Sequence, residues 1–202
     1  MKSQILIITV LFISLTVSAQ DNLSIFQKIE QEGANISNLE CEIDNIRLKA
    51  GKERTKHGML YYQANDKLAT NFENGDYAIF NGIKTKINIG IFRGTFRTNR
   101  DNIFCSLSNM LFCAIQGQCI QVAQSNKFDY SIKEENGTYI VYFDSREKNT
   151  RGIGYKKVVF IYGTNDYRLR SIIMTDYKGT TNTFNLSKPK YGETISADKF
   201  KL

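Results

Sequence analysis

The sequence is poor in histidine, proline and tryptophan, and it lacks the common catalytic motifs. It contains one histidine, His57, one proline, Pro189, and no tryptophan among its 202 residues. A Ser-His-Asp or Cys-His arrangement would have to use His57, which stands among basic residues at the start of a predicted strand. GxSxG, HExxH and phosphate-binding glycine motifs do not occur. We therefore predict a protein that is not an enzyme and that uses no cofactor.

Long apolar runs are also rare. One run, from Ile5 to Val17, follows Lys2 and precedes the small residues Ser18 and Ala19. This pattern is typical of a cleaved secretory signal peptide. The alternative, a membrane anchor, is disfavoured because the run is shorter than about 20 residues. We expect residues 1–19 to be removed after Ala19 and residues 20–202 to form a single exported domain.

Cysteines are few, and their spacing does not favour a metal site. There is no CxxC pair, and His57 is distant from the four cysteines, which are Cys41, Cys105, Cys113 and Cys119. Cys105 and Cys113 lie eight residues apart in a predicted helix, about 12 Å of rise, which is too far for a disulfide. A Cys113–Cys119 bond remains an alternative if the chain turns at Gly117. We favour free, buried cysteines that act as small apolar residues.

The net charge is +7. A basic excess can indicate an anionic partner. Because an exported protein does not meet nucleic acid, acidic lipid headgroups or an acidic protein are the favoured partners. The alternative is that the charge serves solubility alone.

Aromatic residues are abundant, with 11 Tyr and 13 Phe, and they favour strands. Strands are predicted at 36–48 with a bulge near 44–45, and at 57–63, 67–72, 77–80, 83–87, 128–133, 138–144, 155–162, 169–177, 180–186 and near Phe200. Short turns such as Asn81-Gly82 imply sequential antiparallel pairing. The predicted fold is mainly β with a few helices. It has one strongly curved antiparallel sheet of about ten to eleven strands, and a two-sheet sandwich is the alternative.

Two helices interrupt this pattern. Residues 21–31 form a short amphipathic stretch that Gly33 is expected to end. Residues 98–119 form a longer one, with Asn99 or Asp101 as the N-cap, Gly117 as the stop, and apolar residues on one face at Ile103, Phe104, Leu107, Met110, Leu111, Ala114 and Ile115. A single amphipathic helix among strands must lay its apolar face on the sheet. It either closes a core or covers a ligand.

Four segments, in this order, resemble the periplasmic outer-membrane lipoprotein carrier family (LolA-like), in the version found in Bacteroides-type bacteria. GMLYYQANDKLATNF resembles the family's G-x-L-x-y-x-x-P-x-x-L/F segment, and GDYAIFNGIKTKIN resembles its next hairpin. SLSNMLFCAIQG resembles its central helix, and ADKF its terminal D-x-x-F signature. These segments span Gly58–Phe72, Gly75–Asn88, Ser106–Gly117 and Ala197–Phe200.

The resemblance implies an incomplete β-barrel with a helical lid over its concave side. It implies a monomeric periplasmic chaperone that carries lipoprotein acyl chains from inner-membrane release machinery to an outer-membrane acceptor. The same fold could carry phospholipid or another amphiphile, or could serve as a non-binding structural β-domain. Ala64-Asn65 replaces the family's Arg-Pro, so the family's way of holding the lid closed does not carry over.

Alternation along the strands indicates which side chains would line an acyl-chain cavity. The predicted lining residues are Leu60, Tyr62, Leu68, Phe72, Tyr77, Ile79, Ile140, Tyr142, Val159, Ile161, Phe184 and Leu186 on strands, and Phe104, Leu107, Met110 and Leu111 on the lid. Ordinary core packing is the alternative for each. Arg93, Arg97 and Arg100 form a candidate rim, with a solvated loop as the alternative.

Overall fold

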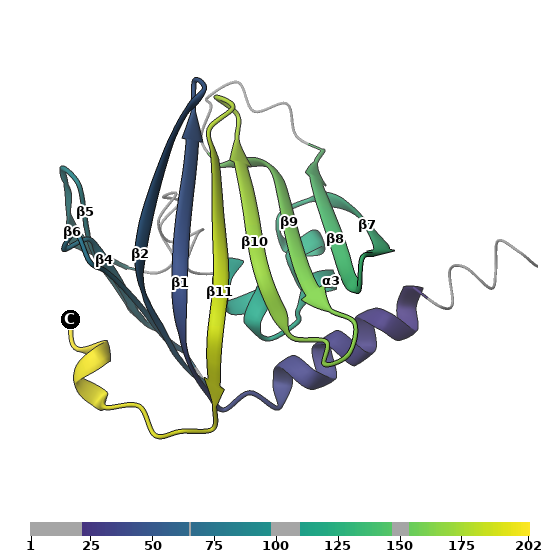
Figure 1. Ribbon diagram of the computed structural model, residues 1–202, viewed down its shortest axis with the longest axis horizontal. Helices are drawn as coiled ribbons and strands as arrows, with labels where there is room; N and C mark the ends of the chain where they lie inside the picture. The colour runs from purple at the N-terminus through teal and green to yellow at the C-terminus, as the bar shows by residue number, and fades with distance from the viewer. Residues whose placement is uncertain (1–21, 65, 98–109, 147–153) are drawn as a thin grey trace, which may run out of the picture.

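The computed structural model describes residues 22–64, 66–97, 110–146 and 154–202 (Figure 1). Some predictions made from the sequence fall elsewhere in the chain and lie outside the described residues. These are the signal peptide at 1–19 and the first part of the central helix, with its N-caps and with Arg100, Phe104, Cys105 and Leu107.

The strands form one antiparallel sheet in the order β6-β5-β4-β3-β2-β1-β11-β10-β9-β8-β7. β1 pairs with β2 on one side and β11 on the other, so it joins an N-terminal meander to a C-terminal one. β6 and β7 are the two edges, and the sheet is not closed into a barrel. The strands are β1 Asn38–Lys49, β2 Lys52–Gln63, β3 Lys67–Phe72, β4 Tyr77–Asn81, β5 Lys84–Ile89, β6 Phe92–Arg97, β7 Phe128–Glu135, β8 Thr138–Ser145, β9 Tyr155–Gly163, β10 Leu169–Asp176 and β11 Thr181–Tyr191.

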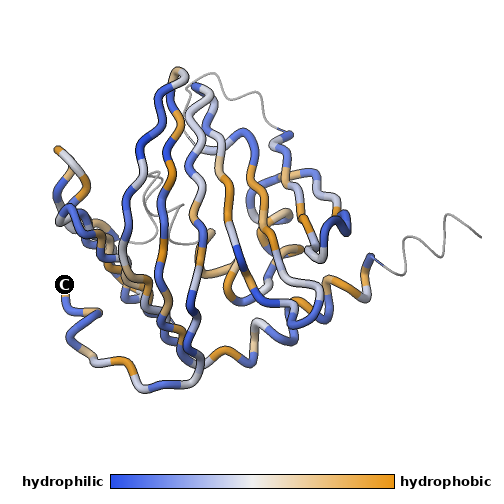
Figure 2. The backbone as a smooth tube through the Cα atoms, viewed as in Figure 1, coloured by the Kyte–Doolittle hydropathy of each residue, from blue (hydrophilic) through white to orange (hydrophobic). Residues whose placement is uncertain are grey.

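This architecture confirms the predicted single open antiparallel sheet rather than the two-sheet sandwich. All eleven strands belong to one hydrogen-bonded sheet, and Figure 2 shows hydrophobic and hydrophilic residues alternating along many of them, as expected for strands with one buried face. Some details of the predicted strands are wrong. β6 was not predicted, because Gly94 interrupts its alternation. β2 begins earlier, at Lys52. The residues near Phe200 form a 3-10 helix, η1 (Ala197–Phe200), instead of a strand.

The bulge lies elsewhere than predicted. The register between β1 and β11 shifts between Glu40 and Glu42, so Lys188 and Pro189 of β11 stand opposite Cys41 alone. Lys188 has a φ of 49°. A bulge suits Pro189, which has no N–H to donate to the ladder. The predicted site near Asp44-Asn45 is regular, since both residues pair in register with β2 and β11.

Besides η1, the described residues contain three α-helical segments: residues 22–34, residues 110–115 and α3 (Cys119–Ser125). Helix 22–34 runs past Gly33, which the sequence had suggested as its end. Gly33 is explained by packing, because a Cβ there would lie 2.2 Å from the backbone carbon of Gln116. A Cβ on Gly117 would lie 2.3 Å from the carbonyl oxygen of Ile29. The two helices therefore touch through their backbones at these two glycines.

The helices pack on one face of the sheet, here called the inner face, which carries Leu60 and Phe160. The main hydrophobic core lies there and includes fully buried residues of β8, β9 and β10 such as Val141, Ile172 and Met174. The opposite, outer face carries a small cluster around Tyr61 and Phe200. Within the described residues, the structure contains no helix that is long and apolar enough to cross a membrane.

Candidate functional site

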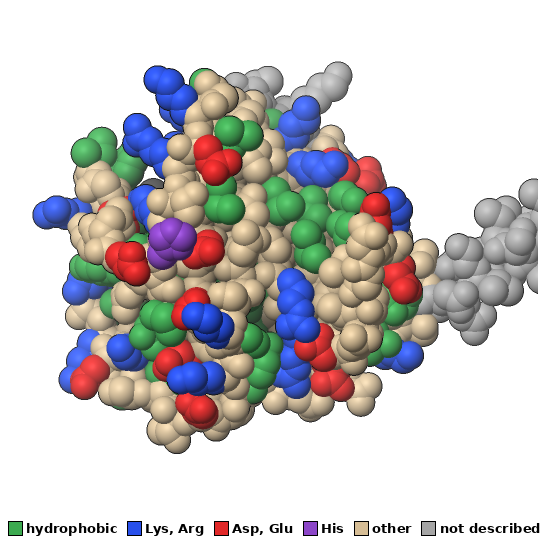
Figure 3. Space-filling view, viewed as in Figure 1, with side chains coloured by type: hydrophobic (Ala, Val, Ile, Leu, Met, Phe, Trp, Pro, Cys, Tyr) green, Lys and Arg blue, Asp and Glu red, His purple; other side chains and the backbone are tan. Residues whose placement is uncertain are grey.

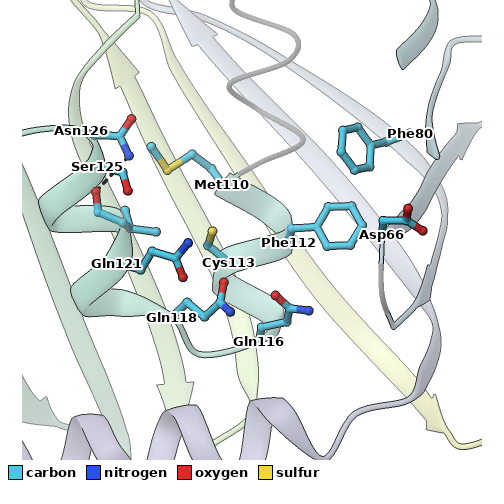
Figure 4. A pocket seen from close by; sticks show the side chains of 11 residues that line it. Asp66, Phe80, Met110, Phe112, Cys113, Gln116, Gln118, Gln121, Ser125 and Asn126 are labelled. Carbon is cyan, nitrogen blue, oxygen red and sulfur yellow. Dashed lines mark hydrogen bonds between the residues drawn. The ribbon is translucent and has the colours of Figure 1, made fainter. Parts of the chain in front are cut away.

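A cavity of 430 Å³ lies beside the central helices, between them and the ends of β3 and β4 (Figure 4). Helix 110–115, the turn after it and α3 supply most of its wall. Its lining residues are Asp66, Phe80, Met110, Phe112, Cys113, Gln116, Gln118, Gln121, Val122, Ser125 and Asn126. Gly117 allows helix 110–115 and α3 to meet at this cavity. Its φ of +70° ends the first helical segment, and α3 then starts at Cys119.

One wall of the cavity is apolar. Phe112 points from its helix toward Phe80 of β4, and the ring centroids lie 4.9 Å apart at 60° (Figure 4). The Phe112 ring also meets Tyr62 of β2, with centroids 5.5 Å apart. Edge-to-face pairs of this kind fix ring positions beyond simple area burial. Met110 and Val122 complete this wall.

The other wall is polar and consists mainly of carboxamides. Gln116 donates from Nε2 to the hydroxyl of Tyr62 at 3.0 Å, and Asn126 donates from Nδ2 to the carbonyl of Val122 at 2.9 Å. Gln118 and Gln121 also border the cavity (Figure 4). An amide both donates and accepts hydrogen bonds, so this wall suits water or an uncharged polar group.

Helix 110–115 and α3, which line the cavity, are held on the sheet by contacts with Tyr162 of β9. Tyr162 of β9 donates from its hydroxyl to the carbonyl of Ala114 at 2.9 Å. The sulfur of Cys119 lies 3.5 Å from the same hydroxyl. Burial raises the pKa of Tyr162 well above its ordinary value, so the phenol stays protonated and keeps its donor. A buried hydrogen bond thus holds the junction of the two helices on the sheet.

Eight of the predicted lining residues lie on the inner face or on the helix that covers it. Met110 borders the cavity itself. The others belong to the core or pack against it, and they are Leu60, Tyr62, Leu68, Phe72, Leu111, Phe184 and Leu186. Tyr62 reaches the cavity wall indirectly, through Phe112 and Gln116.

Six predicted lining residues lie on the outer face instead, and their assignment to the cavity side needs correction. They are Tyr77, Ile79, Ile140, Tyr142, Val159 and Ile161. On β8 the core takes Tyr139, Val141 and Phe143, and on β9 it takes Val158 and Phe160. These strands are apolar on both faces, so alternation could not decide their phase. On β4 the core takes Phe80, while Ile79 packs on the outer cluster.

The arginine rim also differs from expectation. Arg93 and Arg97 belong to the edge strand β6, where both are exposed. Arg93 pairs with Asn88, and Asn88 pairs with Tyr77 of β4. Alternation therefore puts these two arginines on the outer face, away from the cavity.

The stop at Gly117 is confirmed, but sequence reasoning predicted no second helix after it and so missed the part of the cavity wall that α3 supplies. The residues after Gly117 show a helical pattern that could have been recognised in the sequence. Cys119, Val122 and Ala123 have helical spacing, and all three are buried in the structure. Phe80 and Phe112 were available in the sequence as large aromatic residues inside the family-like segments.

The described cysteines are free: Cys41, Cys113 and Cys119. Burial raises the pKa of the Cys113 thiol to about 11 and those of Cys41 and Cys119 to about 12. Such thiols are protonated at neutral pH and are poor nucleophiles. The described residues contain no group of three His, Cys, Asp or Glu side chains that could hold a metal ion.

No family model matches the sequence, and no curated protein sequence does. Solved structures match the fold. A protein from Vibrio parahaemolyticus named as an outer membrane lipoprotein-sorting protein domain superposes with a TM-score of 0.53 at 14% identity, over 90% of this chain and 97% of that one. An uncharacterized conserved protein from Thermus thermophilus gives a TM-score of 0.53 at 10% identity, over 92% and 94% of the two chains.

MucB gives a TM-score of 0.52 at 9% identity, over 91% of this chain and 63% of MucB. At these identities the matches concern the fold. The chain therefore shares its fold with a lipoprotein-sorting protein domain, in agreement with the resemblance that its motifs suggested, while the Bacteroides-type version stays a prediction.

Proposed function

We propose that this protein is an exported periplasmic carrier that binds the acyl chains of lipoproteins and moves them from the inner to the outer membrane. The observation that carries the proposal is the cavity beside helix 110–115 and α3, on the inner face of an open sheet. The fold shared with a lipoprotein-sorting protein domain supports it.

The physical need for such a carrier is large. Each exposed CH₂ group of an acyl chain costs about 0.8 kcal/mol in water. The cavity volume of 430 Å³ lies within the range of roughly 300–1,000 Å³ that is usual for ligand pockets. Met110 and Phe112 supply an apolar wall that can adapt, since methionine fills irregular spaces. The proposed function requires no chemical reaction, because the protein only has to bury an acyl chain and release it.

A second cargo class has its own support. A hydrocarbon chain alone offers no hydrogen-bonding groups to the carboxamide wall of Gln116, Gln118 and Gln121. A phospholipid or another amphiphile could place its chain on the Phe80 side and its polar part on the amides. A non-binding structural β-domain is the remaining alternative, since most of the inner face is closed core.

One experiment separates the three. The mature protein is purified from its native host, and bound molecules are identified by mass spectrometry. Triacylated proteins among them support the lipoprotein carrier, and phospholipid alone supports the second cargo. If nothing is bound and a hydrophobic dye does not enter, the protein is a structural domain and the proposal is wrong.

A matched pair of variants ties the result to the cavity. Gln121 and Gln124 are both exposed residues of α3, but only Gln121 is among the lining residues. Gln121→Trp should fill the cavity and lower dye or cargo uptake by about fivefold or more, and Gln124→Trp should leave it unchanged. Equal uptake by both variants would place the binding site elsewhere.

A further inference from the structure

The β1–β2 hairpin extends beyond the core of the protein. Residues 47–55 are all exposed, although they belong to two long strands that pair regularly up to the turn at Ala50 and Gly51. The hairpin tip projects at the upper end of the sheet in Figure 1. Residues 47–55 contribute no side chain to the hydrophobic clusters.

Four cations occupy one face of this hairpin. Arg47 pairs directly with Arg54 across the two strands, and Lys49 pairs directly with Lys52. Alternation from Ile43 of β1 and Leu60 of β2 places all four on the inner face, the side on which the helices and the cavity lie. We call these four residues the basic tip.

The basic tip has an unbalanced charge. Like charges directly opposite each other destabilise an antiparallel pair. In the described parts of the chain, no carboxylate lies within 4.0 Å of any of these four cationic groups. Glu53, the acidic residue of the tip, pairs with Leu48 and so points to the outer face.

Other exposed lysines are arranged differently. Each of four lysines lies within ion-pair distance of an acidic partner, in the pairs Lys133–Glu135, Lys188–Glu42, Lys190–Glu40 and Lys201–Asp198. The cations of the basic tip therefore differ from these other exposed lysines, because they have no acidic partner among the described residues. Its charge is available to an anionic partner.

Apolar side chains at the same end of the sheet indicate the kind of partner. Ile91 and Phe92 at the β5–β6 turn are 91% and 56% exposed, and Phe92 alternates with Arg93, which places it on the inner face like the basic tip. Leu48 of the hairpin is 44% exposed, but it pairs with Glu53 and so lies on the outer face. The antiparallel order brings the β1–β2 and β5–β6 turns to the same end. Exposed apolar residues beside cations are typical of surfaces that bind anionic membranes, where the cations meet phosphates and the apolar groups enter the interface.

We propose that the basic tip docks the protein on an anionic phospholipid surface, with the inner face and its cavity turned toward the membrane. This goes beyond the proposed cargo, because docking requires no ligand in the cavity. It gives the protein a site for contact with lipid headgroups that is separate from the site for an acyl chain. The two can be tested independently.

The test measures binding of the cargo-free mature protein to vesicles by sedimentation. Vesicles of phosphatidylcholine alone are compared with vesicles that also contain phosphatidylglycerol. We expect binding only to the second kind, weakening steeply with added salt because the Debye length falls below about 10 Å above 0.1 M. The variant is Arg47→Gln, Lys49→Gln, Lys52→Gln and Arg54→Gln combined, which should bind at least about tenfold more weakly.

The control variant removes the same charge from the paired lysines: Lys133→Gln, Lys188→Gln, Lys190→Gln and Lys201→Gln combined. It should bind the anionic vesicles within about twofold of the wild type. Circular dichroism and thermal unfolding of both variants check the fold, and neutralising the tip should not lower its melting temperature because it removes repulsion.

Three results would overturn the proposal. The first is equal binding by the tip variant and the wild type. The second is an equal loss in both variants, which would mean that net charge alone acts. The third is binding of the wild type to polyglutamate but not to the anionic vesicles, which would identify an acidic protein as the partner of the tip.

Discussion

The two faces of the sheet bury apolar side chains to very different extents. The inner face carries a core that runs from Phe80 of β4 to Phe143 of β8 and continues into the helices. The outer face carries a small cluster of Tyr61, Ala69, Ile195 and Phe200, covered by the four-residue helix η1. Figure 3 shows other apolar side chains of this outer face in view among charged residues.

The difference does not follow from the strands alone. β8 and β9 offer apolar side chains to both faces, yet only one face of each receives helices. A strand's pattern thus reports that it can be buried, and the covering element decides which side is buried. The following predictions, from the largest effect to the smallest, test this comparison.

The largest effect is expected from truncating the inner core. Phe160→Ala removes a fully buried ring that packs against Phe143, with centroids 4.9 Å apart, and should lower the free energy of unfolding by about 4 kcal/mol. Phe200→Ala on the outer face should cost about 2 kcal/mol, since η1 can detach locally. Urea unfolding measures both. Equal losses would mean that the two clusters contribute equally to stability.

The glycine contact between the helices gives the next effect. Gly117→Ala adds a Cβ 2.3 Å from the Ile29 carbonyl at a φ of +70°, and should cost about 3 kcal/mol. Gly51→Ala is the control. Its φ is +75° but nothing lies within 4 Å of the added Cβ, so it should cost only about 1 kcal/mol. If both variants lose the same stability, the helix contact is looser than described.

Outer-face positions on β9 should matter little. Ile161→Thr should change the free energy of unfolding by about 0.5 kcal/mol or less and leave cargo uptake unchanged, because the side chain faces away from the cavity. Its neighbour Phe160 faces the core. Dye uptake and urea unfolding check this. A clear loss of uptake in Ile161→Thr would show that cargo uses the outer face.

The smallest effect concerns pH on the outer face. His57 Nδ1 lies 2.7 Å from Asp44 Oδ1 across β1 and β2, and this hydrogen bond raises the pKa of His57 above 6.5. A raised pKa means that the charged pair stabilises the fold below pH 6.5 and that this contribution is lost as pH rises through the folded pKa. NMR titration should show a His57 pKa above 6.5 that returns toward it in Asp44→Asn. An unchanged pKa in that variant would rule out the pairing.

Much of the fold could be predicted from the sequence. The hairpins between 57 and 87 and between 128 and 186 have clear turns and apolar runs, and their strands were placed within a few residues except at the start of β2 and the end of β11. The extensions at those two places are polar and exposed, from Lys52 and to Tyr191. They form strands because β1 pairs with them along its length, a long-range cause that local patterns do not carry.

The cavity was harder to predict than the sheet. Met110 was identified because helical spacing marks it, while Phe80 and Val122 depend on how the chain turns after Gly117. That turn is fixed by the backbone contact with Ile29, more than 80 residues earlier in the chain. The basic tip was not identified either, because its four cations become one face only when β1 and β2 are in register.

The position of β1 has a consequence for the order in which the chain can fold. β1 is the first strand of the sheet, yet one of its two partners is the last strand, with Glu42 bound to Lys188 across 146 residues. Until β11 is available, the N-terminal meander has an unpaired edge in what will become the middle of the sheet. Such non-local pairing folds slowly. The sheet therefore stays incomplete until the last strand of the chain is available to pair with the first.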